Sequence, residues 1–298
     1  MLKLFIKRLL LFLPQVFILS LIVFFLSDGG LGFGQQDSIF VRYWNWLNGV
    51  VRIITIRDFG WSPLIQHSLL NTLRLSLLAL LLVYGIGIPL GIISGRHFGT
   101  LKDRTLQMVT LIGASLPSFT LALILLLFIG FRLGWLPTGG SLPPGMSRET
   151  VSFSTYHIAR LRHMMLPALS LAIVQIIVPM KYLRGDIIDT YHREYITLAR
   201  SKGASEKHLF KKHIFKNSLS STISSVPIQM AAIVTGSIII EMIFAFPGMG
   251  GLLFWAFQFN DVTLVGVLIL IIGLVILVGA FISDIILMIL NPQTKIEE

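Results

Sequence analysis

The chain has 298 residues, of which 54% are hydrophobic and 13% charged, and its mean hydropathy is +0.82. A soluble domain carries about 25% charged residues, so this composition excludes a soluble globular protein and indicates an integral membrane protein. The formal net charge of +10 does not indicate nucleic-acid binding, because the basic residues flank apolar segments, and the absence of cysteine excludes disulfides and thiolate metal sites.

The apolar runs predict an all-α membrane protein with six transmembrane helices. A run of about 20 apolar residues spans the hydrocarbon core of a bilayer. Six runs meet this criterion: Leu9–Leu26, Leu69–Ile93, Leu106–Phe131, Met164–Tyr182, Ile223–Phe244 and Val262–Leu290. We expect one compact bundle, in a single transmembrane domain over residues 1–298.

The basic residues predict the orientation, because short loops rich in Lys and Arg are retained on the cytoplasmic side. Most of the 24 basic residues lie before the first run, between the second and third, and in a charged segment from Lys181 to Lys216. Both termini are therefore expected in the cytoplasm. A basic stretch before an apolar run also resembles a secretory signal, but this run is too long and no small-residue cleavage site follows it.

The first outer loop, residues 27–66, contains an aromatic patch of Tyr43, Trp44 and Trp46, followed by Trp61. Aromatic residues of this kind favour the lipid headgroup boundary. Contact with an external binding protein is the alternative.

Small residues and prolines shape the predicted helices. Gly87, Gly91 and Gly95 recur every four residues and form a face that another helix backbone can approach closely. Prolines interrupt several of the apolar runs, and each frees a carbonyl that neighbouring groups or water must satisfy. They are Pro89, Pro117, Pro179 and Pro227.

The sequence contains no motif that would make this chain an enzyme. There is no phosphate-binding Gly-x-x-x-x-Gly-Lys-Ser/Thr run, no His-Glu-x-x-His and no Gly-x-Ser-x-Gly. His192, His208 and His213 lack carboxylate companions at metal-ligand spacing, so no metal site is expected. Any energy source must lie on another chain.

Few ionisable residues fall within the apolar runs, which disfavours a proton-coupled carrier. Glu241 lies near the outer end of the fifth run and Asp284 in the inner half of the sixth. Glu241 is either a structural acceptor at a helix end or a residue of a pore or gate.

The charged segment reads as helix, turn, helix. Good helix formers run from Glu194 to Lys202, Gly203 is placed to end that helix, and Ser205 opens the next. Short projecting helices can fit a groove on a partner, with Ala199 and Gly203 as the positions of close contact. The alternative is a solvated loop that only fixes topology.

Two motifs resemble the membrane permease subunits of binding-protein-dependent ABC importers for oligopeptides, dipeptides and nickel. The run from Glu194 to Ser205 resembles the cytoplasmic coupling-helix motif, and the run from Glu241 to Gly250 resembles an acidic, aromatic, Pro-Gly signature. Weaker matches follow in the same order as in the family: Asp58–Ser62, Asn71–Leu73, Ser115–Phe119, Leu136–Gly140, His163 with Leu166–Leu169, and Asn291–Pro292.

The resemblance implies a type I permease bundle in a bacterial or archaeal plasma membrane. Its core would cover residues 68–290 and its coupling-helix region 183–222. The implied partners are a second, related permease, an external substrate-binding protein and two cytoplasmic ATPases that hold ATP and Mg. The implied ATPase-coupling residues are Glu194, Ala199, Lys202, Gly203, Ala204 and Ser205; those of an outer gate or scoop are Glu241, Phe244, Phe246, Pro247, Gly248 and Gly250.

Three positions depart from the family pattern. The first outer loop begins with Ser27–Gly30 and is shorter than usual, Thr197 stands where a broader importer motif has glutamate, and Asp261–Thr263 lacks a usual proline. These departures affect binding-protein docking, the coupling motif and the turn before the last helix.

The resemblance implies that the chain is the permease subunit of an ATP-driven importer: it would form half of the translocation pathway for short peptides and couple to the cytoplasmic ATPases by alternating access. Nickel or metallophore complexes and oligosaccharides remain alternative cargoes. A secondary carrier and an assembly scaffold remain alternative classes.

Overall fold

A computed structural model describes residues 2–27, 38–55 and 61–290, and the regular elements in these ranges are all helical. The sequence motifs at Asp28–Gly30, most of Asp58–Ser62 and Asn291–Pro292 lie outside the described residues. In chain order the helices are α1 (Leu2–Leu26), α2 (Ile39–Thr55), α3 (Trp61–Arg96), α4 (Leu101–Ser115), α5 (Ser118–Leu125), the π-helical η2 (Leu126–Arg132), α6 (Phe153–Gln175), α7 (Ile177–Tyr191), α8 (Glu194–Ser201), α9 (Glu206–Leu209), the π-helical η3 (Phe210–Ile214), α10 (Phe215–Ser224), α11 (Val226–Ile243), α12 (Met249–Gln258) and α13 (Val262–Leu290).

Four helices in the described part of the chain are long and apolar enough to cross a membrane, and two bent pairs raise the number to six. The continuous spans belong to α1, α3, α11 and α13. The helix of α5 and η2 is bent by 98° from α4, and α7 is bent by 41° from α6. The predicted bundle of six spans is therefore confirmed when each bent pair counts as one span.

Pro117 explains the sharper bend, since it lies between the end of α4 and the start of α5 and cannot continue a helix. Pro227 lies in the first turn of α11, where a missing N–H is tolerated. Pro89, by contrast, lies inside the continuous α3. Only some of the prolines predicted to interrupt spans therefore mark a break.

The first outer loop is more ordered than expected, because it contains α2. Tyr43 of α2 stacks on Trp46, and its hydroxyl lies 2.7 Å from Ser20 Oγ of α1. Trp61, the first residue of α3, lies against Trp255 of α12 with ring centroids 5.2 Å apart. The aromatic patch thus joins helices as well as lying at the outer end, although Trp44 remains 62% exposed.

The glycine face of α3 lies against α7. A Cβ on Gly87 would lie 2.7 Å from Pro179, one on Gly91 would lie 3.0 Å from the Met180 carbonyl, and one on Gly95 would lie 2.9 Å from Ile187. These distances are shorter than ordinary van der Waals contact. The three glycines therefore let α3 and α7 approach closely over two turns.

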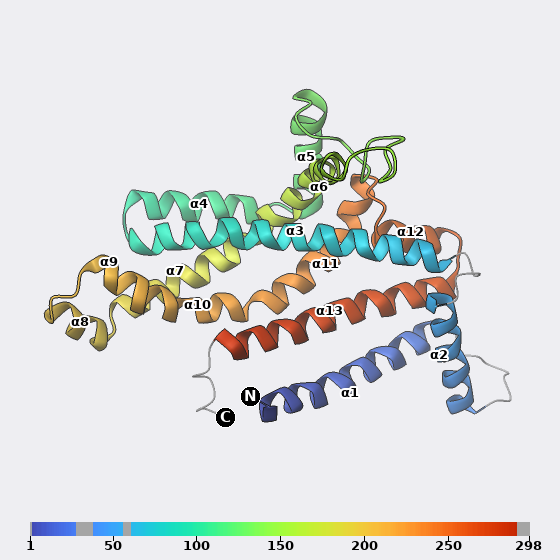
Figure 1. Cartoon of the computed structure of the whole chain (residues 1–298), viewed down its shortest axis with the longest axis horizontal. Coiled ribbons are helices and arrows are strands. Elements are labelled where there is room, and N and C mark those ends of the chain that lie inside the picture. Colours follow the sequence, from blue (N-terminus) through green and yellow to red (C-terminus); the bar gives the residue numbers. More distant parts are fainter. Residues whose placement is uncertain (1, 28–37, 56–60, 291–298) are drawn as a thin grey trace.

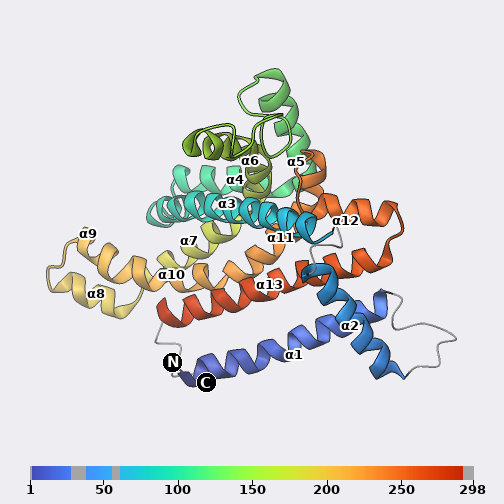
Figure 2. The same cartoon turned by 45° about the vertical axis from the view of Figure 1, so that its right-hand side comes forward.

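Asp284 has a partner at the inner end of the bundle. Its Oδ2 lies 2.9 Å from Arg8 Nη1, so an ion pair joins α13 to α1, and Phe12 and Phe281 add a ring contact at 5.2 Å. Figures 1 and 2 show the hairpin of α8 and α9 at one end of the molecule and α2 with α12 at the other. These two ends correspond to the predicted cytoplasmic and outer sides.

Candidate functional site

The segment from Glu241 to Gly250 connects α11 to α12, and we call it the outer junction. Glu241 is fully buried, and both oxygens of its carboxyl accept hydrogen bonds from elsewhere in the chain. Thr72 Oγ1 of α3 donates to Oε1 at 2.6 Å, and the backbone N–H of Gly250 donates to Oε2 at 2.6 Å. The geometry favours the structural alternative for Glu241, an acceptor that joins three helices.

Two neighbouring residues of α3 hold the outer junction. Thr72 Oγ1 also accepts a hydrogen bond from the Met249 N–H at 2.8 Å, so this one hydroxyl links α11, α12 and α3. Asn71 Nδ2 donates to the Pro247 carbonyl at 2.9 Å. The weak sequence match at Asn71–Leu73 therefore lies directly on the strong one at Glu241–Gly250.

The loop between η2 and α6 reaches the same place. The Gly140 N–H donates to the Phe244 carbonyl at 2.9 Å, and His163 Nδ1 donates to the Gly139 carbonyl at 2.9 Å. A Cβ on Gly139 would lie 2.8 Å from the Phe244 oxygen. Matches that are scattered along the sequence thus meet in one structure.

The outer junction has no room for a Cβ atom at two of its glycines, Gly248 and Gly250. A Cβ on Gly248 would collide with the Glu241 carboxyl, and one on Gly250 would lie 2.5 Å from Cα of Ile238. Ala245 adopts φ +44°, a left-handed conformation that is uncommon outside glycine. The chain therefore turns tightly around Glu241.

Phe244 and Phe246 are buried and do not lie on an open rim of this chain. Their side chains are 1% and 2% exposed and belong to the hydrophobic core that α3, α6 and α11 form. Within this chain they stabilise the outer junction by packing.

The second candidate region is the hairpin of α8 and α9. The Gly203 N–H donates to the Arg200 carbonyl and the Ala204 N–H to the Ala199 carbonyl, the pattern of a helix end closed by a left-handed residue. Gly203 supplies that residue with φ +84°. Ser205 then accepts a hydrogen bond from the His208 N–H at 3.4 Å and opens α9.

One side of the hairpin is buried against the rest of the chain, and the other side is exposed. Ile196, Leu209 and Ile214 are buried in a cluster with α7, against which Ala199 and Ala204 also pack. Leu198 is 57% exposed and Tyr195 41% exposed. Ala199 thus contacts its own chain, and the exposed apolar side chains of α8 were missed at the sequence level.

The polar residues of the hairpin lie on its surface. Arg200 Nε donates to Glu206 Oε1 at 2.7 Å, and this hydrogen bond raises the pKa of Arg200 above its ordinary value. Glu194 lies in the first turn of α8, and Lys202 caps its end. Both are exposed.

An ion pair that sequence reasoning missed fixes the inner ends of the helices. Arg184 of α7 donates to both oxygens of Asp103 in α4, with distances of 2.8 Å from Nε and from Nη2. Asp103 also accepts from Ser94 of α3, from Gln107 Nε2 at 2.9 Å and from the Gly99 N–H at 3.0 Å. The sequence signal for this ion pair was Asp103 itself, a single acidic residue among the basic residues between the second and third apolar runs.

No group of three or more His, Asp or Glu side chains in the described residues could hold a metal ion. The polar groups of the outer junction are instead engaged with one another.

Comparison with known proteins identifies the family. Residues 87–296 match the family model for the binding-protein-dependent transport system inner membrane component. The oligopeptide transport system permease protein AppB of Bacillus subtilis is 30% identical over 88% of this chain and 83% of its own length. The peptide transport system permease protein SapB of Salmonella typhimurium is 30% identical over 96% of this chain and 95% of its own. SapB of Escherichia coli K12, 27% identical over the same shares, is named a putrescine export system permease.

Solved structures agree on the fold. A chain of the inward-facing MetNI methionine ABC transporter superposes with a TM-score of 0.59 and 15% identity, over 76% of this chain and 96% of that one. At this identity the likeness shows the fold alone. On the family match and the close relatives, the chain belongs to the binding-protein-dependent transport system inner membrane components and is a multi-pass membrane permease subunit of an ABC importer.

Proposed function

We propose that this chain forms half of the translocation pathway of an importer for short peptides. The observation that supports peptides as the cargo is the 30% identity to an oligopeptide permease over 88% of the chain. Several further relatives, at 29% identity, are named as putative peptide permeases. A second, related permease would supply the other half, and an external binding protein would deliver the peptide.

The hairpin of α8 and α9 is the proposed contact with a cytoplasmic ATPase. Its exposed Tyr195 and Leu198 offer apolar surface to a cleft, while Ile196 and Leu209 fix the hairpin to the bundle. ATP and Mg would be held by the two ATPase subunits. Movement of the ATPases would then be passed to α7 and α10.

The outer junction is proposed to move as one rigid unit beside the pathway. The Glu241 carboxyl is hydrogen-bonded on both oxygens, and the glycines packed around it leave no room for a Cβ atom. The outer junction therefore has little conformational freedom of its own. Opening and closing of the outer side would then come from displacement of α3, α11 and α12 together.

Purification of the native complex tests this proposal. We expect the chain to be isolated in mild detergent with a sister permease, ATPase subunits and a binding protein, and the receptor to carry a peptide. A receptor that binds a nickel complex, an oligosaccharide or putrescine would contradict the peptide cargo but not the importer class. A chain that transports in vesicles without ATP would contradict the importer and favour a secondary carrier.

A further inference from the structure

Two hollows meet at the lysines of α9 and η3. The larger, of about 490 Å³, is lined by Ile92 and Arg96 of α3 and by Lys207, Phe210, Lys211 and Phe215. The smaller, of about 360 Å³, is lined by Ser205, Lys207, His208, Lys211 and Lys212. Lys207 and Lys211 line both, and we call the larger hollow the basic groove.

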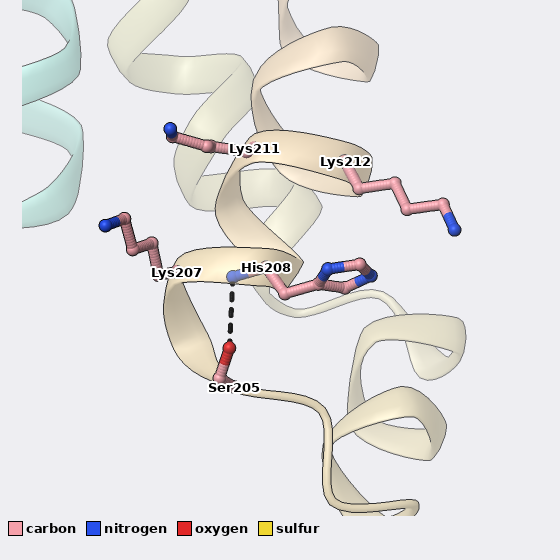
Figure 3. Close-up of a pocket in the computed structure, with 5 residues that line it drawn as sticks. All are labelled: Ser205, Lys207, His208, Lys211 and Lys212. Atoms are coloured by element: carbon pink, nitrogen blue, oxygen red, sulfur yellow. Dashed lines mark hydrogen bonds between the residues drawn. The ribbon is translucent and has the colours of Figure 1, made fainter.

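The two lysines point in one direction. In Figure 3, Lys207 and Lys211 extend to the same side of the helix, whereas His208 and Lys212 extend to the opposite side. The spacing of four residues places the two ammonium groups on one helical face. Lys212 therefore carries a similar charge on the same segment without lining the basic groove.

The cations of the basic groove are not neutralised by the described part of the chain. None of Arg96, Lys207 and Lys211 forms an ion pair with a described carboxylate. The nearest acid in sequence, Glu206, is engaged by Arg200 at 2.7 Å. Arg96 lies over the ring of Phe210, 4.7 Å from its centroid, which keeps the guanidinium beside the groove.

The basic groove lies where the apolar part of α3 ends. Ile92 lies one turn before Arg96, and Arg96 is the last residue of this membrane-crossing helix. Beyond it, Phe98 and Leu101 are 58% and 80% exposed. Charged and apolar side chains that alternate at a helix end are typical of the level of the lipid headgroups.

We propose that the basic groove binds an anionic phospholipid of the inner leaflet. Lys207, Lys211 and Arg96 would hold its phosphate, and Ile92, Phe210 and Phe215 would contact its acyl chains. Basic pockets between membrane helices on the cytoplasmic side suit this ligand. A free phosphate would leave the apolar walls unused, and a lipid without net charge would leave three cations without a counterion.

Native mass spectrometry of the importer with dioleoyl phosphatidylglycerol tests the proposal. Phosphatidylcholine of the same chains measures binding without net charge, and glycerol phosphate measures binding without chains. The groove variant is Lys207→Gln with Lys211→Gln. Its matched control, Lys212→Gln with Lys216→Gln, removes the same charge from positions outside the basic groove.

We expect the wild type to retain phosphatidylglycerol over phosphatidylcholine. The groove variant should bind it at least about 10-fold more weakly, since each lysine near an anionic lipid surface contributes several-fold to binding, while the control should change by less than about twofold. If the groove variant melts early in lipid-free detergent, Arg96→Gln replaces it.

Three results would overturn the proposal. Equal losses in both double variants would indicate general attraction, and displacement of the lipid by equimolar glycerol phosphate would indicate a phosphate site. Binding to the isolated chain but not to the assembled importer would show that another subunit covers the basic groove.

Discussion

Thr72 shows how much of the outer junction depends on one hydroxyl. It donates to the Glu241 carboxyl and accepts from the Met249 N–H, and both partners are buried. Leaving a buried hydrogen-bond donor or acceptor without a partner lowers the stability of the fold by about 1–3 kcal/mol. The stability of three helices therefore depends on this side chain.

We predict that Thr72→Val lowers stability by about 1–3 kcal/mol, because valine keeps the shape and removes the hydrogen bonds to Glu241 Oε1 and from the Met249 N–H. Thermal unfolding of the purified protein in detergent measures the change. Thr105→Val is the matched control, since the Thr105 hydroxyl is exposed and donates only to the Leu101 carbonyl. An equal effect of the two variants would contradict the bridging role of Thr72.

Gly250, the last residue of the outer junction, and the adjacent Gly251 differ in the space around them. Gly250→Ala would bring Cβ to 2.5 Å from Ile238 Cα, whereas the nearest atom to a Cβ on Gly251 is the Phe246 oxygen at 3.8 Å. We predict a loss of about 1–3 kcal/mol for Gly250→Ala, as for overpacked cores, and little change for Gly251→Ala. Comparable melting temperatures for both would show that the junction relaxes.

The residues of the outer junction were predictable only in part. The Glu241–Gly250 signature was recognised, but its role was left open between a gate and a structural acceptor. Asn71 and Thr72 lie about 170 positions away in sequence, and no local periodicity reports such a contact. Burial of Phe244 and Phe246 likewise depends on tertiary packing, which residue type alone does not reveal.

At the scale of elements, the ion pair of Asp103 and Arg184 fixes α4 to α7. The side chains are 2% and 18% exposed, so removal of one partner leaves a charge with little solvent. Removing one partner of a buried pair costs about 3–5 kcal/mol of stability. Replacing both partners by apolar residues of similar size costs much less, because no unpaired charge remains. The pair of Arg200 and Glu206, 47% and 59% exposed, provides the contrast.

We predict that Asp103→Leu and Arg184→Met each destabilise the protein by about 3 kcal/mol, and that the double variant Asp103→Leu/Arg184→Met costs less than their sum. Arg200→Met should change stability by less than about 1 kcal/mol. Melting temperatures of the four proteins give the comparison. Strict additivity at Asp103 and Arg184 would show that the contact contributes nothing.

The helices themselves were largely predictable, because long apolar runs leave few choices in a bilayer. The 98° bend at Pro117 and the helix α2 were not. A proline marks a possible break without giving its angle, as Pro89 inside α3 shows. The amphipathic α2 lay in a segment treated as a loop, since its apolar face is too short to span a membrane.

At the scale of the whole molecule, α3 links the two candidate regions. Thr72 near its outer end holds the outer junction, while its glycine face lies against α7, which leads into the hairpin of α8 and α9. A helix of 36 residues is about 54 Å long. Displacement of the hairpin would therefore reach the outer side through α7 and α3 with few intervening joints.

The measurement that tests this account most directly is peptide uptake and ATP hydrolysis by the importer in proteoliposomes, with Gly203→Trp compared with Gly203→Ala. Both variants carry the strain of a side chain at φ +84°, and a Cβ there meets no atom of the chain within 4 Å, so they differ mainly in bulk toward a partner. We predict that Gly203→Ala keeps most uptake and that Gly203→Trp hydrolyses ATP without uptake. Undiminished uptake by Gly203→Trp would contradict the proposed coupling role of the hairpin.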